Sequence, residues 1–280
     1  MPPSSKGTPT PKSKPAQRKT LRKPASPKRK RKQRKLSLPW WSVAAAIAAV
    51  VLAVSLPYWI ATADHSVGAP VPEGGYRHYA VDLSHHNKDI QWDSLRIVID
   101  RQGRTSKDIL RSREILPVSQ VFLKATEGES MKDDRFDEYW AQAARVGIPR
   151  GAYHFFRTSK DPLLQAQNFI SAVTLTHADL PPVLDVETIH SGCTPEELNR
   201  KALTWLKTVE AHYGRKPMVY TNDKFALDIL SEDITGHYPL WIARYNSAPP
   251  RTSGWSSWQF SDKAVVYGIR GYVDLSVIQK

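Results

Sequence analysis

The chain has 280 residues and a formal net charge of +13, a length that suits one large domain with appendages. Of its 40 Lys and Arg residues, 14 lie within residues 1–35, and no Asp or Glu precedes Asp64, so the basic excess belongs to a tail and the remainder is nearly neutral. The single cysteine, Cys193, excludes an intramolecular disulfide and a zinc site built from several cysteines.

Residues 1–38 are rich in Lys, Arg, Pro, Ser and Thr and contain very few apolar side chains. Such a composition cannot bury enough surface to offset chain entropy, which predicts a disordered basic tail. The expected partner of this tail is anionic lipid on the cytoplasmic leaflet. Nucleic-acid binding is the alternative, but it is not expected because the tail lacks interleaved aromatic residues.

A charge-free stretch of 28 residues follows, from Leu36 to Ala63, and we predict a transmembrane helix over residues 39–61. Trp40 and Trp59 lie near its two ends, roughly 28 Å apart along a helix, which matches the aromatic belts of a bilayer. Basic residues precede the span and none follows it closely. We therefore expect a single-pass protein of the cytoplasmic (inner) membrane, with its N-terminus in the cytoplasm and its globular domain extracytoplasmic or periplasmic.

A cleaved signal peptide is the competing interpretation, because Ala61 and Ala63 resemble a cleavage site. Signal peptides usually have shorter basic leaders and apolar cores of roughly 7–15 residues, which favours an uncleaved anchor. Residues 62–75 contain several Pro and Gly residues and are predicted to form a linker. The globular domain is then expected over residues 76–280.

Short apolar runs that end in polar residues recur through this domain, and helical patterns separate several of them. This alternation predicts an α/β fold, an irregular (β/α)8-like barrel of the TIM type. A doubly wound open sheet is the second possibility, although no Gly-rich phosphate loop follows any strand. Residues 95–117 are expected to form an inserted loop with at most one helix. The predicted strands are residues 78–84, 121–127, 150–156, 181–187, 217–222, 240–246, 255–261 and 272–278.

Helix-capping signals support this reading. Thr194 followed by Glu197 forms a capping box, and Gly214 marks the end of the same helix. Asp161 before Pro162 indicates another helix start. Apolar residues at helical spacing begin at Phe136 and predict a further helix between the second and third strands.

Four carboxylates lie at predicted strand ends. Asp185 and Glu187 are two residues apart, so on a strand they project from one face, about 6.6–6.8 Å apart. Asp82 and Asp274 end the first and last strands, which are neighbours in a closed barrel. Nearby carboxylates raise one another's pKa, so one of them holds its proton, and this supplies the acid and the charge stabiliser that glycosidic bond cleavage requires.

Metal binding is a competing explanation for clustered acidic residues. His85 and His86 would face opposite sides of a strand, and His154 is expected to be a structural histidine. No His-x-His or His-Glu-x-x-His pattern occurs, so no metal or other cofactor is expected. Aromatic rings near strand ends favour a sugar, on whose faces they can stack; these are Tyr153, Phe155, Tyr220, Trp241, Tyr245 and Trp258.

The domain resembles glycoside hydrolase family 25, the lysozymes that cleave the β-1,4 bond between N-acetylmuramic acid and N-acetylglucosamine. The resemblance rests on "VDLSHHN", "FLKATEG", "PVLDVE", "PMVYTN", "LWIARYN" and "WQFSD", which occur in the family's order. It implies an irregular barrel and a peptidoglycan substrate. The sequence departs from the family at Asn87 and Lys88, at Ser276, where the family has Asn, and in the longer segment 95–117.

The resemblance also implies residue roles. Glu187 is the expected general acid, and Asp185 the residue that stabilises the substrate's acetamido group or the developing positive charge. Asp82 and Asp274 complete the acidic site. Retention through the 2-acetamido group is the implied outcome, although strand spacing alone does not separate it from inversion. The expected substrate-binding residues are Tyr153, Tyr220, Trp241, Arg244 and Gln259.

Two other functions fit the same residues: an inactive barrel that binds glycan strands as a scaffold, and a hydrolase of chitin or another exogenous glycan. Retention of all four acids disfavours the scaffold. The predicted anchor favours a wall polymer within reach over a diffusing substrate. Oligomeric state and envelope type are left open by the sequence.

Overall fold

The computed structural model describes residues 67–279, together with Ala45 and Ala49, which are helical. The chain divides into two compact units, residues 1–57 and 58–280, and residues 67–279 belong to the second. In the part of the chain that the structure describes, no helix has the length and apolar character needed to cross a membrane. The predicted tail over 1–38 and nearly all of the predicted span over 39–61 lie outside these residues.

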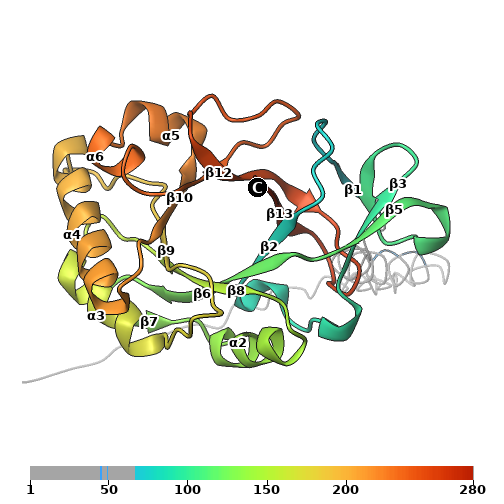
Figure 1. Ribbon diagram of the computed structural model, residues 1–280, viewed down its shortest axis with the longest axis horizontal. Coiled ribbons are helices and arrows are strands. Elements are labelled where there is room, and N and C mark those ends of the chain that lie inside the picture. The colour runs from blue at the N-terminus through green and yellow to red at the C-terminus, as the bar shows by residue number, and fades with distance from the viewer. Residues whose placement is uncertain (1–44, 46–48, 50–66, 280) are drawn as a thin grey trace, which may run out of the picture. The chain divides into compact units, whose positions relative to one another are not determined.

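Eight strands form a closed barrel in the order β2-β13-β12-β11-β10-β9-β8-β6, with β6 pairing back to β2. The sequence places all eight correctly to within a few residues. Viewed along the barrel, the strands surround a common centre (Figure 1). Their bounds are Tyr79–Leu83 (β2), Gln120–Glu127 (β6), Arg150–Phe155 (β8), Val183–Asp185 (β9), Met218–Asn222 (β10), Leu240–Ala243 (β11), Trp255–Ala264 (β12) and Val273–Ile278 (β13).

The barrel departs from the regular alternating pattern at its last strand. Strand β13 is antiparallel to both β12 and β2, whereas the strands from β2 through β6, β8, β9, β10 and β11 to β12 are parallel. No helix lies between β11 and β13. A short strand, β7 (Met131–Lys132), adds a hairpin to β6.

Helices pack outside the parallel part of the barrel, and α3 and α4 lie on the side opposite β3 and β5 (Figure 1). The predicted caps of two of them are confirmed. Thr194 accepts a hydrogen bond from Glu197 N at 3.2 Å, Asp161 caps α3, and Gly214 ends α4 with a φ of 61°. The helices are α2 (Phe136–Arg145), α3 (Pro162–Ala172), α4 (Pro195–Tyr213), α5 (Asp223–Asp228) and α6 (Glu232–Thr235).

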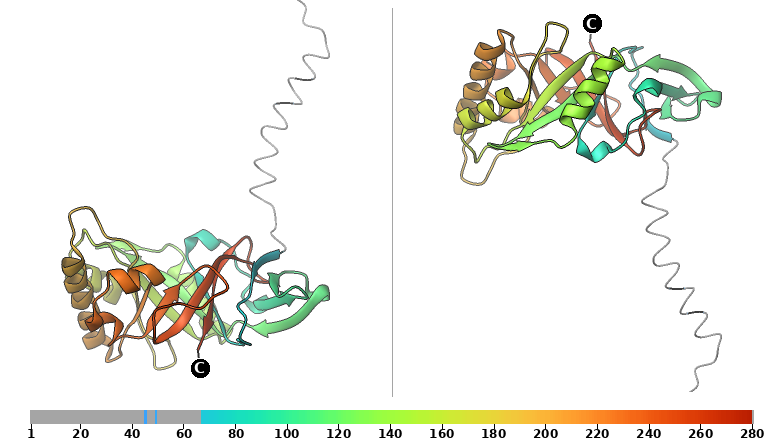
Figure 2. Two further views of the ribbon diagram at one scale, coloured as in Figure 1. Left: turned by 90° about the horizontal axis from the view of Figure 1, so that it is seen from above. Right: turned by 90° about the horizontal axis from the view of Figure 1, so that it is seen from below.

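A second, four-stranded sheet replaces the predicted loop over 95–117, so that expectation is wrong. The sheet lies at the opposite end of the domain from α4 (Figure 2). The apolar run Ile97–Ile99 is fully buried, so this segment forms a strand whose neighbours cover it. In order, the sheet contains β1 (Val67–Pro70), β4 (Arg104–Ser106), β3 (Arg96–Asp100) and β5 (Ser112–Pro117).

Strand β1 also corrects the predicted linker, because residues 67–70 pair with β4 instead of forming an open connection. Three short 3-10 turns complete the described structure: η1 (His85–Asn87), η2 (Trp92–Ser94) and η3 (Ile109–Arg111). The main core lies between the barrel and its helices. A smaller apolar cluster consists of residues from the barrel strands: Ala80, Phe122, Val183, Tyr220, Trp241 and Ala243.

Candidate active site

The four predicted acids line one cleft at the carboxyl ends of the parallel strands. Asp82 lies in β2 and Asp274 in β13, Asp185 is the last residue of β9, and Glu187 follows two residues later. The cleft has a volume of about 230 Å³. Convergence of these residues follows from barrel closure, because β2 and β13 are adjacent and β9 lies across the ring (Figure 1).

Asp82 and Asp274 form a carboxyl pair. Their backbones are register partners between β2 and β13, and their side chains hydrogen-bond to each other. Burial, followed by the charge of Asp274, raises the pKa of Asp82 well above its usual range. Burial also raises the pKa of Asp274, which accepts the hydrogen bond. The pair therefore holds one proton, mainly on Asp82.

Asp185 and Glu187 form a second carboxyl pair, also joined by a hydrogen bond. Burial and then the charge of Glu187 raise the pKa of Asp185 well above its usual range, whereas Lys124 lowers it. The pKa of Glu187 is raised by burial and by the charge of Asp274. Asp185 Oδ1 has no hydrogen-bond partner, although it is buried. A buried carboxyl oxygen without a partner suits contact with a ligand.

Aromatic side chains form one wall of the cleft. Tyr153, Tyr220 and Trp241 all line it, as the sequence placed them. The rings of Tyr220 and Trp241 meet edge to face with centroids 4.7 Å apart. Trp241 Nε1 donates to Ser276 Oγ at 2.9 Å, so the residue that departs from the family pattern fixes this indole. The wall therefore presents aromatic rings to the same cleft as the acids.

Gln259 lies behind the cleft and does not line it. Its Nε2 donates to Asp82 Oδ2 at 2.9 Å, and its Oε1 accepts from the hydroxyl of Tyr220 at 2.7 Å. The side chain is only 1% exposed. In this position the amide of Gln259 orients one acid of the cleft and one wall tyrosine, and its contact with substrate stays a prediction.

Arg244 also lies outside the cleft lining. Strand β11 ends at Ala243, and the next side chain turns toward the start of α5. There Arg244 Nη1 forms an ion pair with Asp223 Oδ2 at 2.9 Å. The sequence motif placed Arg244 next to a strand end but gave no information about this partner.

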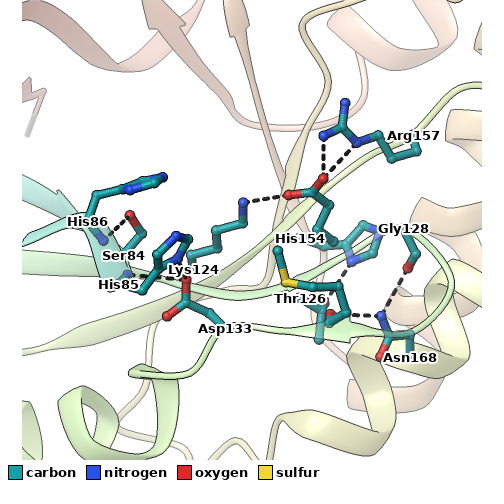
Figure 3. A network of polar contacts seen from close by, with 12 residues as sticks. Ser84, His85, His86, Lys124, Thr126, Gly128, Asp133, His154, Arg157 and Asn168 are labelled. Carbon is teal, nitrogen blue, oxygen red and sulfur yellow. Dashed lines mark hydrogen bonds and ion pairs between the residues drawn. The ribbon is translucent and has the colours of Figure 1, made fainter.

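Lys124 also lines the cleft, as do Ser84 and His86, although none of the three was predicted to be a site residue. Its ammonium group donates to Glu127 Oε2 at 2.6 Å, and Glu127 also pairs with Arg157. Figure 3 labels Lys124 and Arg157, the two cations at the ends of this chain of contacts. A lysine within the apolar strand "FLKATEG" was the available signal, because a charge in a buried strand needs a partner.

The adjacent histidines His85 and His86 lie in the turn η1 and not in a strand. The prediction that they face opposite sides of a strand is therefore wrong. Their ring centroids lie 3.9 Å apart. His85 Nδ1 contacts Asp133 Oδ2 at 2.6 Å, whereas His86 lines the cleft (Figure 3). Within residues 67–279, Ala45 and Ala49, no three His, Cys, Asp or Glu side chains form a group that could hold a metal ion.

His154 has the structural role that the sequence favoured. It is completely buried, with ring nitrogens 2.7 Å from Thr126 Oγ1 and 3.2 Å from Gln165 Oε1. Its ring stacks on Trp205 at 5.5 Å between centroids. Burial lowers the pKa of His154 to about 4, so the imidazole is neutral at pH 7.

The sequence and fold match known proteins. The sequence profile of glycosyl hydrolases family 25 covers residues 81–269. Uncharacterized protein YegX of Escherichia coli K12 is 33% identical over 204 residues, 72% of this chain and 70% of YegX. Lysozyme M1 of Streptomyces globisporus is 31% identical over 209 residues, 69% of this chain and 65% of the lysozyme.

Solved structures with the same fold include a family 25 glycosyl hydrolase from Bacillus anthracis, with a TM-score of 0.61 at 25% identity. That alignment covers 78% of this chain and 95% of the other. The bacterial lysozyme from Streptomyces coelicolor aligns with a TM-score of 0.62 at 26% identity, covering 74% of this chain and 94% of the lysozyme.

Proposed function

Because the chain belongs to glycosyl hydrolases family 25, we propose that it is a muramidase, which cleaves the β-1,4 bond between N-acetylmuramic acid and N-acetylglucosamine in peptidoglycan. The proposal rests mainly on one observation: two hydrogen-bonded carboxyl pairs, Asp82–Asp274 and Asp185–Glu187, line one cleft with an aromatic wall. Relatives named lysozyme M1 and autolytic lysozyme support the same substrate class.

Glu187 acts as the general acid in this proposal. Its carboxyl is half-buried, and burial raises its pKa, which favours the protonated form that a general acid requires. Departure of the leaving sugar requires this proton on the glycosidic oxygen. Asp185 holds the shared proton when the cleft is empty, and the hydrogen bond between the two carboxyls lets it pass to Glu187.

Attack at the anomeric carbon comes from the substrate's own 2-acetamido oxygen. A carboxylate nucleophile must lie on the ring face opposite the acid, about 5–5.5 Å from it in retaining enzymes. Asp185 hydrogen-bonds to Glu187 and therefore sits on the same side. Its role is to bind the acetamido N–H and stabilise the cyclic cation, which water then opens with retention as Glu187 accepts the water's proton.

The test of this function uses the full chain, because a fragment that begins at residue 76 lacks strand β1. Peptidoglycan digested by the protein is expected to release fragments with reducing muramic-acid ends. Release of fragments with reducing N-acetylglucosamine ends would show that the protein cleaves the bond on the other side of the muramic acid, which would contradict the proposal. Binding of glycan strands without turnover would support the inactive scaffold, and faster cleavage of chitin oligomers would support an exogenous glycan.

The membrane tether is a separate part of the proposal. The charge-free stretch 36–63 and the basic residues before it support an anchor with the catalytic domain outside the cytoplasmic membrane. Carbonate extraction of membranes should leave the full chain in the pellet. Recovery of a soluble form that begins at Asp64 would support signal cleavage instead.

A further inference from the structure

A second groove, here called the outer groove, has a volume of about 580 Å³. It lies between the small sheet and the end of the barrel. One wall consists of β1 with Arg104, and the other of residues from β12 and the loops before and after it. The lining residues are Val67–Pro70, Arg104, Tyr245–Ser247, Phe260–Lys263 and Tyr272.

The outer groove adjoins the catalytic cleft through Tyr245. This side chain is 52% exposed and lines the groove. Its hydroxyl donates to Gln259 Oε1 at 2.9 Å, and the amide of Gln259 holds Asp82 in the cleft. On the same side, the charge of Asp262 in the groove acts on Asp274. The groove therefore lies next to the acids of the cleft.

The wall formed by the small sheet is fixed to the barrel. A Cβ added at Gly68 would lie 2.6 Å from Thr105 Oγ1 and 2.6 Å from Val265 N, so β1 packs against β12 without space for a side chain. Val265 N also donates to Thr105 Oγ1 at 3.1 Å. The groove is thus preformed, which limits the entropy that binding must overcome.

The groove's charged side chains favour an anion. Arg104 and Lys263 are exposed, and neither forms an ion pair with any residue that the structure describes. Arg104 Nε donates to Gly68 O at 3.0 Å, which directs its guanidinium along the wall. Asp262 is the single carboxylate in the lining, so cations outnumber it. Guanidinium and ammonium groups of this kind bind carboxylates.

We propose that the outer groove binds the acidic stem peptide carried by the muramic acid of peptidoglycan. Arg104 and Lys263 bind the peptide's carboxylates, and Asn246 and Ser247 offer hydrogen bonds to its backbone. This inference rests on the proposed function, since a stem peptide reaches the groove only when its sugar occupies the cleft. It assigns a substrate-recognition role to β1 and β4, which lie in the segments predicted to be linker and loop.

The test compares two substrates for each protein: glycan strands with intact tetrapeptide stems, and the same strands stripped of peptide by an amidase. The full-length wild-type chain should show a higher kcat/KM on the peptide-bearing strands. In R104A/K263A, the ratio of the two kcat/KM values should fall by about tenfold. An unchanged ratio would overturn the proposal. The control, R101A/K207A, removes two exposed cations outside the groove and should keep the wild-type ratio.

Direct binding separates failure of this inference from failure of the proposed function. A soluble stem tetrapeptide of L-alanine, D-glutamate, a diamino acid and D-alanine is titrated into the full chain, with heat of binding as the readout. Saturable binding is expected for wild type and at least tenfold weaker binding for R104A/K263A, even if neither glycan is cleaved. Equal binding by the two proteins would contradict the assignment of the groove as a peptide site. The proposed muramidase activity is tested separately, by cleavage of the glycan.

Discussion

Asp82 and Asp274 are direct cross-strand neighbours whose carboxyl groups share a hydrogen bond. Two ionised carboxylates in these positions would destabilise the sheet, so the pair holds a proton. The pair joins the first and last strands of the barrel. Closure of the barrel and assembly of the acidic site are therefore one structural event.

The proton held by this pair predicts a pH dependence of stability. Because the folded-state pKa of Asp82 is raised, its contribution is fully present below the unfolded pKa and is lost as pH rises through the folded value. The free energy of unfolding should fall by up to about 1.4 kcal/mol per pH unit over that range. Asp82→Asn should reduce this slope, measured by urea denaturation between pH 5 and 9. The exposed control Asp134→Asn should keep it; equal slopes in the two variants would contradict the shared proton.

Asp185→Asn tests the second carboxyl pair. In the wild type, loss of the last proton from the Asp185–Glu187 pair would leave two like charges side by side, which raises the pKa for that step. With Asn at position 185 only one charge forms, so Glu187 should lose its proton at a lower pH than the wild-type pair loses its last one. The alkaline limb of the pH–kcat/KM profile should shift to lower pH, and kcat/KM should fall by about 10²-fold. A variant profile whose alkaline limb coincides with that of wild type would exclude coupling between these residues.

His154→Ala should destabilise the domain without touching the cleft. The substitution empties a fully buried site and leaves Thr126 and Gln165 without their partner, at a cost of about 2–4 kcal/mol. Its folded pKa of about 4 lies below the usual value, so the stability it contributes is lost as pH falls below about 6.5. Thermal denaturation of the variant beside the exposed control His237→Ala measures both effects. Loss of activity at unchanged stability would indicate a catalytic or ligand role instead.

Gly68→Ala should weaken the contact between the small sheet and the barrel. The new methyl group meets backbone and side-chain atoms at 2.6–2.8 Å, and overpacking of this kind costs about 1–3 kcal/mol. Hydrogen exchange should then increase in β1 and β4 and stay unchanged in β9 and β10. Unchanged exchange in β1 would show that the strand does not pack against β12 as described.

The barrel strands could be predicted from the sequence because each is a short apolar run that ends in a polar residue. The acids could be placed because closure of the barrel makes its first and last strands neighbours. The small sheet could not be predicted in this way, since its strands are short and β1 pairs with β4, which lies more than 30 residues later in the chain. Arg244 and Gln259 show the other limit. A motif locates a side chain at a strand end, but only tertiary contacts decide whether it faces the cleft or a neighbour such as Asp223 or Asp82.

The central claim is that Glu187 protonates the glycosidic bond of peptidoglycan. Mass spectrometry of muropeptides, after digestion by the full-length wild type and by Glu187→Gln, tests it directly. Wild type should release disaccharide muropeptides with reducing muramic-acid ends. Glu187→Gln should release 10²–10⁴-fold fewer of them at an unchanged thermal midpoint, and the exposed control Glu232→Gln should match wild type. Equal release by Glu187→Gln and wild type would contradict the account.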